Sequence, residues 1–169
     1  NDVRSLDKKA LPLMVERYSA LSINTVGEFV RPALDPVLDC DLENRSSLVS
    51  KYNLSTTGSI ALAPGAEFGP AKKWPISYFA DVAKYCLEIG RQVWLLGSKK
   101  DQSDCEHIEN KATGVINLAG KTSIEDVVDI ISLADILVCN DSGLMHVSAA
   151  LNTKTVALFG STSDEYTPP

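Results

Sequence analysis

From residue 59 onward, short apolar runs alternate with stretches whose apolar residues recur at helical spacing. The runs are 60–63, 93–96, 115–118, 136–139 and 155–159, and the helical stretches are about 76–89, 101–112, 123–133 and 143–151. Continuous apolar strands separated by helices are typical of a parallel sheet that is covered on both faces. The pattern therefore predicts an α/β domain built on a doubly wound parallel sheet.

The first 58 residues do not show this alternation of apolar runs and helical stretches. Residues 8–21 place apolar side chains at helical spacing, with Pro12 in the first turns, and predict an amphipathic helix. Residues 22–58 predict an irregular connection that holds one short helix, about 43–52. We interpret 1–58 as the tail of a preceding domain plus a connection, and 59–169 as the α/β domain. The chain starts without Met and ends on two prolines, so we expect both ends to be cuts through a longer protein.

Composition argues against several classes of protein. The net charge of −6 argues against nucleic acid as a partner, because binding a phosphate backbone needs a basic face. No apolar run approaches the roughly 20 residues of a membrane-spanning helix. The four cysteines are widely spaced and there are only two histidines, so we expect neither a disulfide framework nor a metal site. Cys86 and Cys139 lie in apolar stretches and are expected to be buried thiols.

Ligands of doubly wound sheets bind at the carboxyl ends of the strands, so the residues after each apolar run are the candidate site. The most informative of these turns is 140–146, where Asn-Asp-Ser-Gly separates a strand from a helix. Backbone N–H groups at a helix start favour an anion such as phosphate. Asp141 could also be a simple helix cap. His146 could be a structural helix residue that shares a face with Ser142.

Each of the other strand ends allows both a functional and a structural interpretation. Lys72 and Lys73 follow the first strand and could hold a phosphate or be solvated. Asp101, after the second strand, could bind ribose or cap the next helix, and the helix cap is favoured. Around residues 122–126, Thr and Ser followed by Glu and Asp form a capping-box-like start. The hydroxyl-rich loop 160–164 could face a phosphate or be an ordinary polar turn.

Taken together, the strand-end motifs resemble a known family. PGAEFGPAKKWP (64–75), LLGSKKD (95–101), NLAGKTS (117–123), NDSGLMHVSAAL (140–151) and VALFGSTSDEYTPP (156–169) resemble the C-terminal half of ADP-heptose:lipopolysaccharide heptosyltransferases. These enzymes are two-domain glycosyltransferases of the GT-B class, in family 9. The first and fourth motifs are most similar to the members that add the second inner-core heptose, and residues 1–20 resemble the end of the family's N-terminal domain.

The resemblance implies a donor site. Lys72 matches the family lysine that contacts the donor phosphates, beside a loop with Gly65 and Ala66. Asp101 matches the residue that holds the adenosine ribose, and Thr122 lies where backbone atoms meet the adenine. The remaining matches belong to the donor-binding motif, in which Asp141 faces heptose hydroxyls and backbone amides face the pyrophosphate; they are Asp141, Ser142, Gly143 and His146.

The resemblance also implies what the chain does not contain. The family's proposed catalytic base is an Asp in a glycine-aspartate loop near the start of the N-terminal domain, so we expect no catalytic base here. The implied fold is the Rossmann-like C-terminal domain of a GT-B enzyme, preceded by a helical and irregular segment from its partner domain.

The implied activity is transfer of heptose from ADP-heptose, with inversion, to the heptosyl-Kdo inner core on lipid A. We expect no cofactor and no metal, and a cytoplasmic location at the inner face of the inner membrane, where the full protein could associate peripherally. Two alternatives remain: a GT-B transferase for another nucleotide sugar, and a non-catalytic module that binds a nucleotide sugar. A dinucleotide-binding dehydrogenase domain is disfavoured, because no G-x-G-x-x-G opens the first helix.

Overall fold

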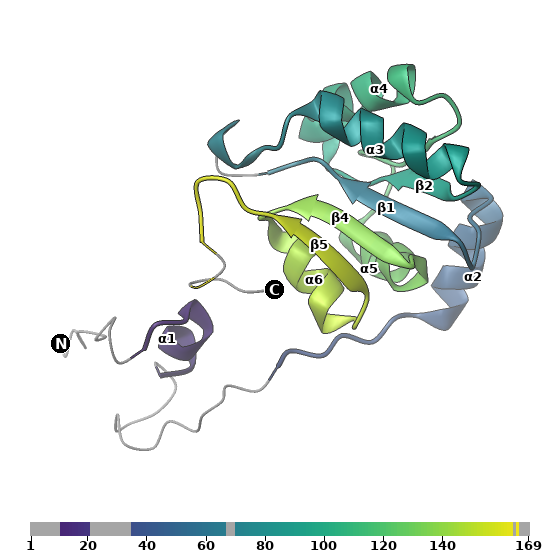
Figure 1. Cartoon of the computed structure of the whole chain (residues 1–169). Coiled ribbons are helices and arrows are strands. Elements are labelled where there is room, and N and C mark those ends of the chain that lie inside the picture. Colours follow the sequence, from purple (N-terminus) through teal and green to yellow (C-terminus); the bar gives the residue numbers. More distant parts are fainter. Residues whose placement is uncertain (1–10, 21–34, 67–69, 164, 166–169) are drawn as a thin grey trace. The chain divides into compact units, whose positions relative to one another are not determined.

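The computed structural model describes residues 11–20, 35–66, 70–163 and 165 (Figure 1). The chain divides into two compact units, one made of Asn1–Pro36 with Ser163–Pro169 and the other of Val37–Thr162. In the described part of the first unit, α1 (Met14–Ala20) lies within the predicted helix 8–21. Residues 8–10 and 21 of that prediction lie outside the described residues.

The second unit is built on a parallel sheet. Its strands are β1 (Ser59–Ala63), β2 (Gln92–Leu95), β3 (Ile116–Asn117), β4 (Ile136–Asn140) and β5 (Lys154–Leu158), in the order β3-β2-β1-β4-β5. The chain moves outward from β1 to β3, then returns to the other side of β1 for β4 and β5. This reversal between β1 and β4 is the switch point of a doubly wound sheet. The predicted fold class is confirmed.

Helices cover both faces of the sheet (Figure 1). They are α2 (Leu42–Tyr52), α3 (Ile76–Glu88), α4 (Gln102–Lys111), α5 (Ile124–Leu133) and α6 (Gly143–Ala150). Side chains from α3 and α4 pack on one face, and side chains from α2, α5 and α6 pack on the other. None of the helices in the described ranges has the length and apolar character that a membrane span requires.

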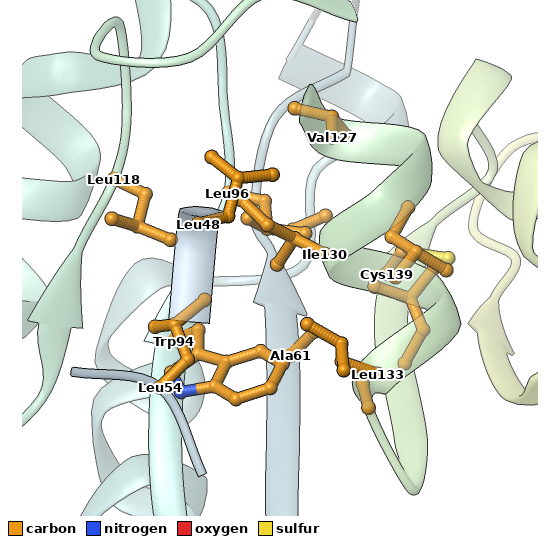
Figure 2. Packing of buried hydrophobic residues seen from close by; sticks show 14 of the residues in the cluster. Leu48, Leu54, Ala61, Trp94, Leu96, Leu118, Val127, Ile130, Leu133 and Cys139 are labelled. Carbon is orange, nitrogen blue, oxygen red and sulfur yellow. The ribbon is translucent and has the colours of Figure 1, made fainter. Parts of the chain in front are cut away.

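Strand alternation explains why two cores form. On β1, Ala61 faces the layer of α2, α5 and α6, and Leu62 faces the layer of α3 and α4. Figure 2 shows the first of these cores, where the Trp94 ring lies among aliphatic side chains of the strands and helices. Trp94 is fully buried, and its indole N–H donates to the Gln92 side chain over 2.6 Å. The predicted buried thiol Cys139 lies in this core, where burial, with the nearby Asp141 charge, raises its pKa to about 12.

Local signals account for where the helices start. Ser123 is the N-cap of α5 and forms a capping box with Asp126, as predicted for this turn. Asp41 caps α2 by accepting from the N–H groups of Glu43 and Asn44. The α2 helix packs on α5 and belongs to the same compact unit as the sheet.

Candidate functional site

A cavity of about 430 Å³ opens at the carboxyl edge of the sheet. It is formed by the loops that follow β1, β2 and β4 and by the start of α5, so it lies at the switch point. Its walls combine aliphatic side chains with loop backbone and a few polar groups. The lining residues are Ala63, Gly65, Ala66, Leu96, Gly97, Ser98, Asp101, Thr122, Ser123, Ile124, Val127, Ser142, Gly143, Leu144 and Val147.

Most of the predicted donor-binding residues meet in this one cavity, although they come from four separate loops. Those that line it are Gly65, Ala66, Asp101, Thr122, Ser142 and Gly143. The other three, Lys72, Asp141 and His146, do not line it. Asp141 directly precedes Ser142, and His146 is the fourth residue of α6, so both are close in sequence to the cavity wall.

Lys72 and Asp141 form an ion pair beside the cavity. The Lys72 ammonium lies 2.7 Å from Oδ2 of Asp141, whose side chain is only 8% exposed. The hydroxyl of Thr162 donates to the same oxygen over 2.7 Å. Burial works to raise the pKa of Asp141, but the hydrogen bonds from Lys72 and Thr162, with the Lys72 and His146 charges, outweigh it and lower that pKa. Asp141 is therefore a buried carboxylate that is held ionised.

The two neighbouring lysines have different partners. Lys73 pairs with Asp104 on α4 at 2.9 Å, and this hydrogen bond raises the pKa of Lys73. Lys72, the last residue of the short 3-10 helix Pro70–Lys72, points instead to the end of β4. Of these two lysines, Lys72 is the one that contacts the predicted donor-binding motif.

The Asp101 side chain packs directly against Gly65 and Gly97, where a larger residue would leave it no room. Its Oδ2 accepts from the N–H and the hydroxyl of Ser98, in a capping box at the start of the short 3-10 helix Lys99–Asp101. A Cβ on Gly65 would lie 2.6 Å from Oδ1 of Asp101, and a Cβ on Gly97 would lie 2.9 Å from its Cβ. Asp101 is also the N-cap residue of α4, as the favoured sequence interpretation predicts, but its carboxylate makes no cap bond to that helix. It lies instead in the cavity wall.

The first turn of α6 is open toward the cavity. Ser142 is the N-cap residue, yet its side chain makes no cap hydrogen bond. The N-cap is therefore Ser142 and not Asp141, which excludes the interpretation of Asp141 as a simple cap. A Cβ on Gly143 would meet nothing within 4 Å. Unsatisfied N–H groups at a helix start are a favourable place for an anion.

Sequence reasoning did not place Asn140 or Thr162 among the site residues. Asn140 is fully buried at the end of β4. Its amide donates to the Pro64 carbonyl over 2.7 Å and accepts from the Trp74 N–H over 2.9 Å, so it fixes both ends of the loop that carries Lys72. An Asn at the buried end of an apolar strand is an available sequence signal, because a buried amide needs partners.

One polar atom in the cavity wall has no partner among the described residues. The hydroxyl of Thr122 is buried and makes no hydrogen bond. Within the same described residues, no group of three or more His, Cys, Asp or Glu side chains is arranged to hold a metal ion. The absence of a cofactor remains a prediction.

A doubly wound parallel sheet with a cavity at its switch point is a Rossmann-like fold with a ligand site at the carboxyl ends of its strands. All 169 residues match the sequence profile of glycosyltransferase family 9 (heptosyltransferase), and the chain belongs to this family.

The known proteins to which the chain is similar are also heptosyltransferases. The chain is 43% identical to lipopolysaccharide heptosyltransferase 2 of Escherichia coli K12 and 39% identical to lipooligosaccharide heptosyltransferase 2 of Haemophilus influenzae. Both matches cover the whole chain and 52% of the relative, so the chain spans about half the length of these curated relatives. The solved structure of E. coli ADP-heptose lipopolysaccharide heptosyltransferase II superposes with a TM-score of 0.89, at 43% identity, over all of this chain and 54% of that one.

Proposed function

We propose that this chain forms the donor-binding half of a heptosyltransferase that transfers heptose from ADP-heptose to the inner core of lipopolysaccharide. The observation that carries the proposal is the convergence of four loops on one cavity, with the Lys72–Asp141 pair beside it. The relatives that support the substrate are lipopolysaccharide and lipooligosaccharide heptosyltransferases 2.

The donor fits this site by its chemistry. The aliphatic walls, Ile124, Val127 and Leu144 among them, suit a flat nucleobase, and the Asp101 carboxylate can accept hydrogen bonds from ribose hydroxyls. The diphosphate would lie at the open start of α6, where Lys72 supplies a positive charge. Asp141 would then accept hydrogen bonds from the hydroxyls of the sugar.

In the transfer step, an acceptor oxygen attacks the anomeric carbon as the bond from that carbon to the diphosphate oxygen breaks. Negative charge then develops on the leaving ADP. Donors already aimed at that position lower the barrier, because they need no reorganisation as the charge forms. Lys72 and the α6 backbone amides would supply this stabilisation. The base that takes the proton from the acceptor hydroxyl is expected in the family's N-terminal domain, outside this chain.

The proposal is tested by calorimetry with the chain and ADP-heptose, ADP, a UDP-sugar and a GDP-sugar. We expect ADP-heptose and ADP to bind and the other two to bind much more weakly. Lys72→Ala should weaken ADP binding by about 1–3 kcal/mol, the scale of a lost charge-assisted hydrogen bond.

The matched control is Lys73→Ala, which removes the neighbouring lysine whose partner is Asp104 on α4. It should leave ADP affinity nearly unchanged. Preference for a UDP- or GDP-sugar would indicate another nucleotide-sugar transferase. Full ADP affinity in Lys72→Ala would contradict the phosphate role of this residue.

A further inference from the structure

The Asp141 carboxylate is held from two sides at a single oxygen. Lys72 Nζ and Thr162 Oγ1 each lie 2.7 Å from Oδ2. Within the described part of the chain, neither of these donors binds Oδ1. Oδ1 is therefore the oxygen that remains to accept a hydrogen bond from a ligand.

Thr162 reaches Asp141 because the loop after β5 is fixed in place. The N–H of Asp141 donates to the carbonyl of Leu158 over 3.1 Å, which joins the ends of β4 and β5. Two residues further on, Gly160 packs so closely that a Cβ there would lie 2.9 Å from the Ala71 carbonyl oxygen. The loop that carries Thr162 thus touches the 3-10 helix that carries Lys72, and both side chains converge on one carboxylate.

The two donors would respond differently to an anionic ligand. Lys72 is a cation on a flexible stem, so a diphosphate competes with Asp141 for its ammonium group. Thr162 is neutral and has a short, β-branched side chain with few rotamers. A diphosphate attracts its hydroxyl far less than it attracts an ammonium group.

We propose that Thr162 is a positioning residue that keeps Oδ1 of Asp141 turned toward the sugar when Lys72 turns to the donor phosphate. This inference rests on the proposed function, because it requires a sugar diphosphate in the cavity. It deepens that function by assigning the loop after β5 to recognition of the sugar. ADP lacks the sugar, so the role of Thr162 should concern ADP-heptose and not ADP.

The test compares Thr162→Val, which keeps the shape and removes the hydroxyl, with Thr162→Ser, which keeps the hydroxyl. Dissociation constants of the chain for ADP-heptose and ADP are measured by calorimetry. We expect Thr162→Val to lose about tenfold in affinity for ADP-heptose, as for one hydrogen bond to a charged group, and less than about twofold for ADP. Thr162→Ser should restore ADP-heptose affinity to within about twofold of the original.

Thr113→Val is the matched control, because Thr113 is exposed and lies between α4 and β3, outside the cavity. It should change neither affinity. Equal losses for both ligands in Thr162→Val, or no rescue by serine, would overturn the role of Thr162 while leaving the donor site intact. An original chain that binds neither ADP-heptose nor ADP would overturn the proposed function itself, and this inference with it.

Discussion

At the residue scale, the central feature of the site is a carboxylate that is both buried and ionised. Asp141 is 8% exposed, and an isolated carboxylate at such a position would tend to protonate. Lys72 and Thr162 prevent this by donating to one of its oxygens. Asp141 would accept a hydrogen bond from a sugar hydroxyl. It is therefore kept ionised in part by Lys72, the residue that would bind the phosphate.

This arrangement predicts the effect of Lys72→Met on the pKa of Asp141. Without the ammonium group, burial is opposed mainly by Thr162 and the His146 charge, so the pKa of Asp141 should rise. NMR titration of the Asp141 carboxyl carbon would measure this rise. Lys73→Met should leave the titration unchanged, since Lys73 pairs with Asp104. An unchanged pKa in Lys72→Met would mean that the ion pair does not persist in solution.

The lowered pKa of Asp141 also makes the free energy of unfolding depend on pH. In the original chain the folded pKa of Asp141 lies below its ordinary value, which is about 3.8. Its contribution to the free energy of unfolding is therefore complete above that value and is lost as the pH falls through the folded pKa. In Lys72→Met the folded pKa is higher, so this contribution is smaller and disappears at a higher pH.

Residue roles of this kind could be predicted from the sequence only in part. The strand-end motifs identify Lys72, Asp101 and the 140–146 turn, because the carboxyl ends of parallel strands meet at one edge. The sequence cannot show that Lys72 and Lys73 separate to different partners, since both follow the same loop. In the sequence, Thr162 is one of several polar residues in the loop 160–164. Its hydrogen bond to Asp141, 21 positions away, depends on the fold and cannot be predicted from that loop alone.

At the element scale, the helices and strands are largely predictable and the exceptions have local causes. The predicted strand 115–118 is shorter in the structure, as β3 covers only Ile116–Asn117. It is an edge strand that pairs with β2 alone. The Asn117 side chain accepts from the Ala119 N–H over 3.1 Å, which turns the chain just after the strand.

A buried acid in α5 accepts hydrogen bonds from the start of α2. Asp129 is 3% exposed, and it accepts from the Asp41 N–H and from the Asn44 amide, both over 2.8 Å. In Asp129→Asn, an NH2 group replaces one of the two accepting oxygens. It would face the Asp41 N–H or the Asn44 amide and leave at least one of these two donors without an acceptor. The free energy of unfolding should fall by about 1–3 kcal/mol, as measured by urea denaturation.

Asp135→Asn provides the comparison for this prediction. Asp135 pairs with Arg91 at 3.2 Å, and both side chains are nearly half exposed. An exposed ion pair of this kind contributes little, so the change should be within about 0.5 kcal/mol. If the two variants were equally stable, the network around Asp129 would not hold α2 in place.

At the scale of the whole molecule, the sheet and the cavity are consequences of one topology. The reversal of strand order between β1 and β4 leaves the loops after these strands on opposite sides of a gap, and the cavity occupies it. The walls of the cavity belong to the same compact unit as both hydrophobic cores. A ligand that bridges these loops should therefore bind the folded unit and not the unfolded chain.

This linkage predicts that ADP raises the melting temperature of the chain. At a free concentration about 100 times the dissociation constant, binding to the folded state adds about 2.7 kcal/mol to the free energy of unfolding. For a chain of this size that is a shift of roughly 5–10 °C, which differential scanning fluorimetry would detect. At the same ADP concentration, Lys72→Ala should show a much smaller shift, because its dissociation constant is higher.

A core variant separates binding from stability in this measurement. Leu137 is fully buried on β4 and does not line the cavity, so Leu137→Ala should cost about 2–5 kcal/mol of stability and lower the melting temperature without ligand. Its stabilisation by ADP should nevertheless match that of the original chain, since the loops that form the cavity are unchanged. If Leu137→Ala lost the ADP-dependent shift while Lys72→Ala kept it, ADP would not be binding at the carboxyl edge of the sheet.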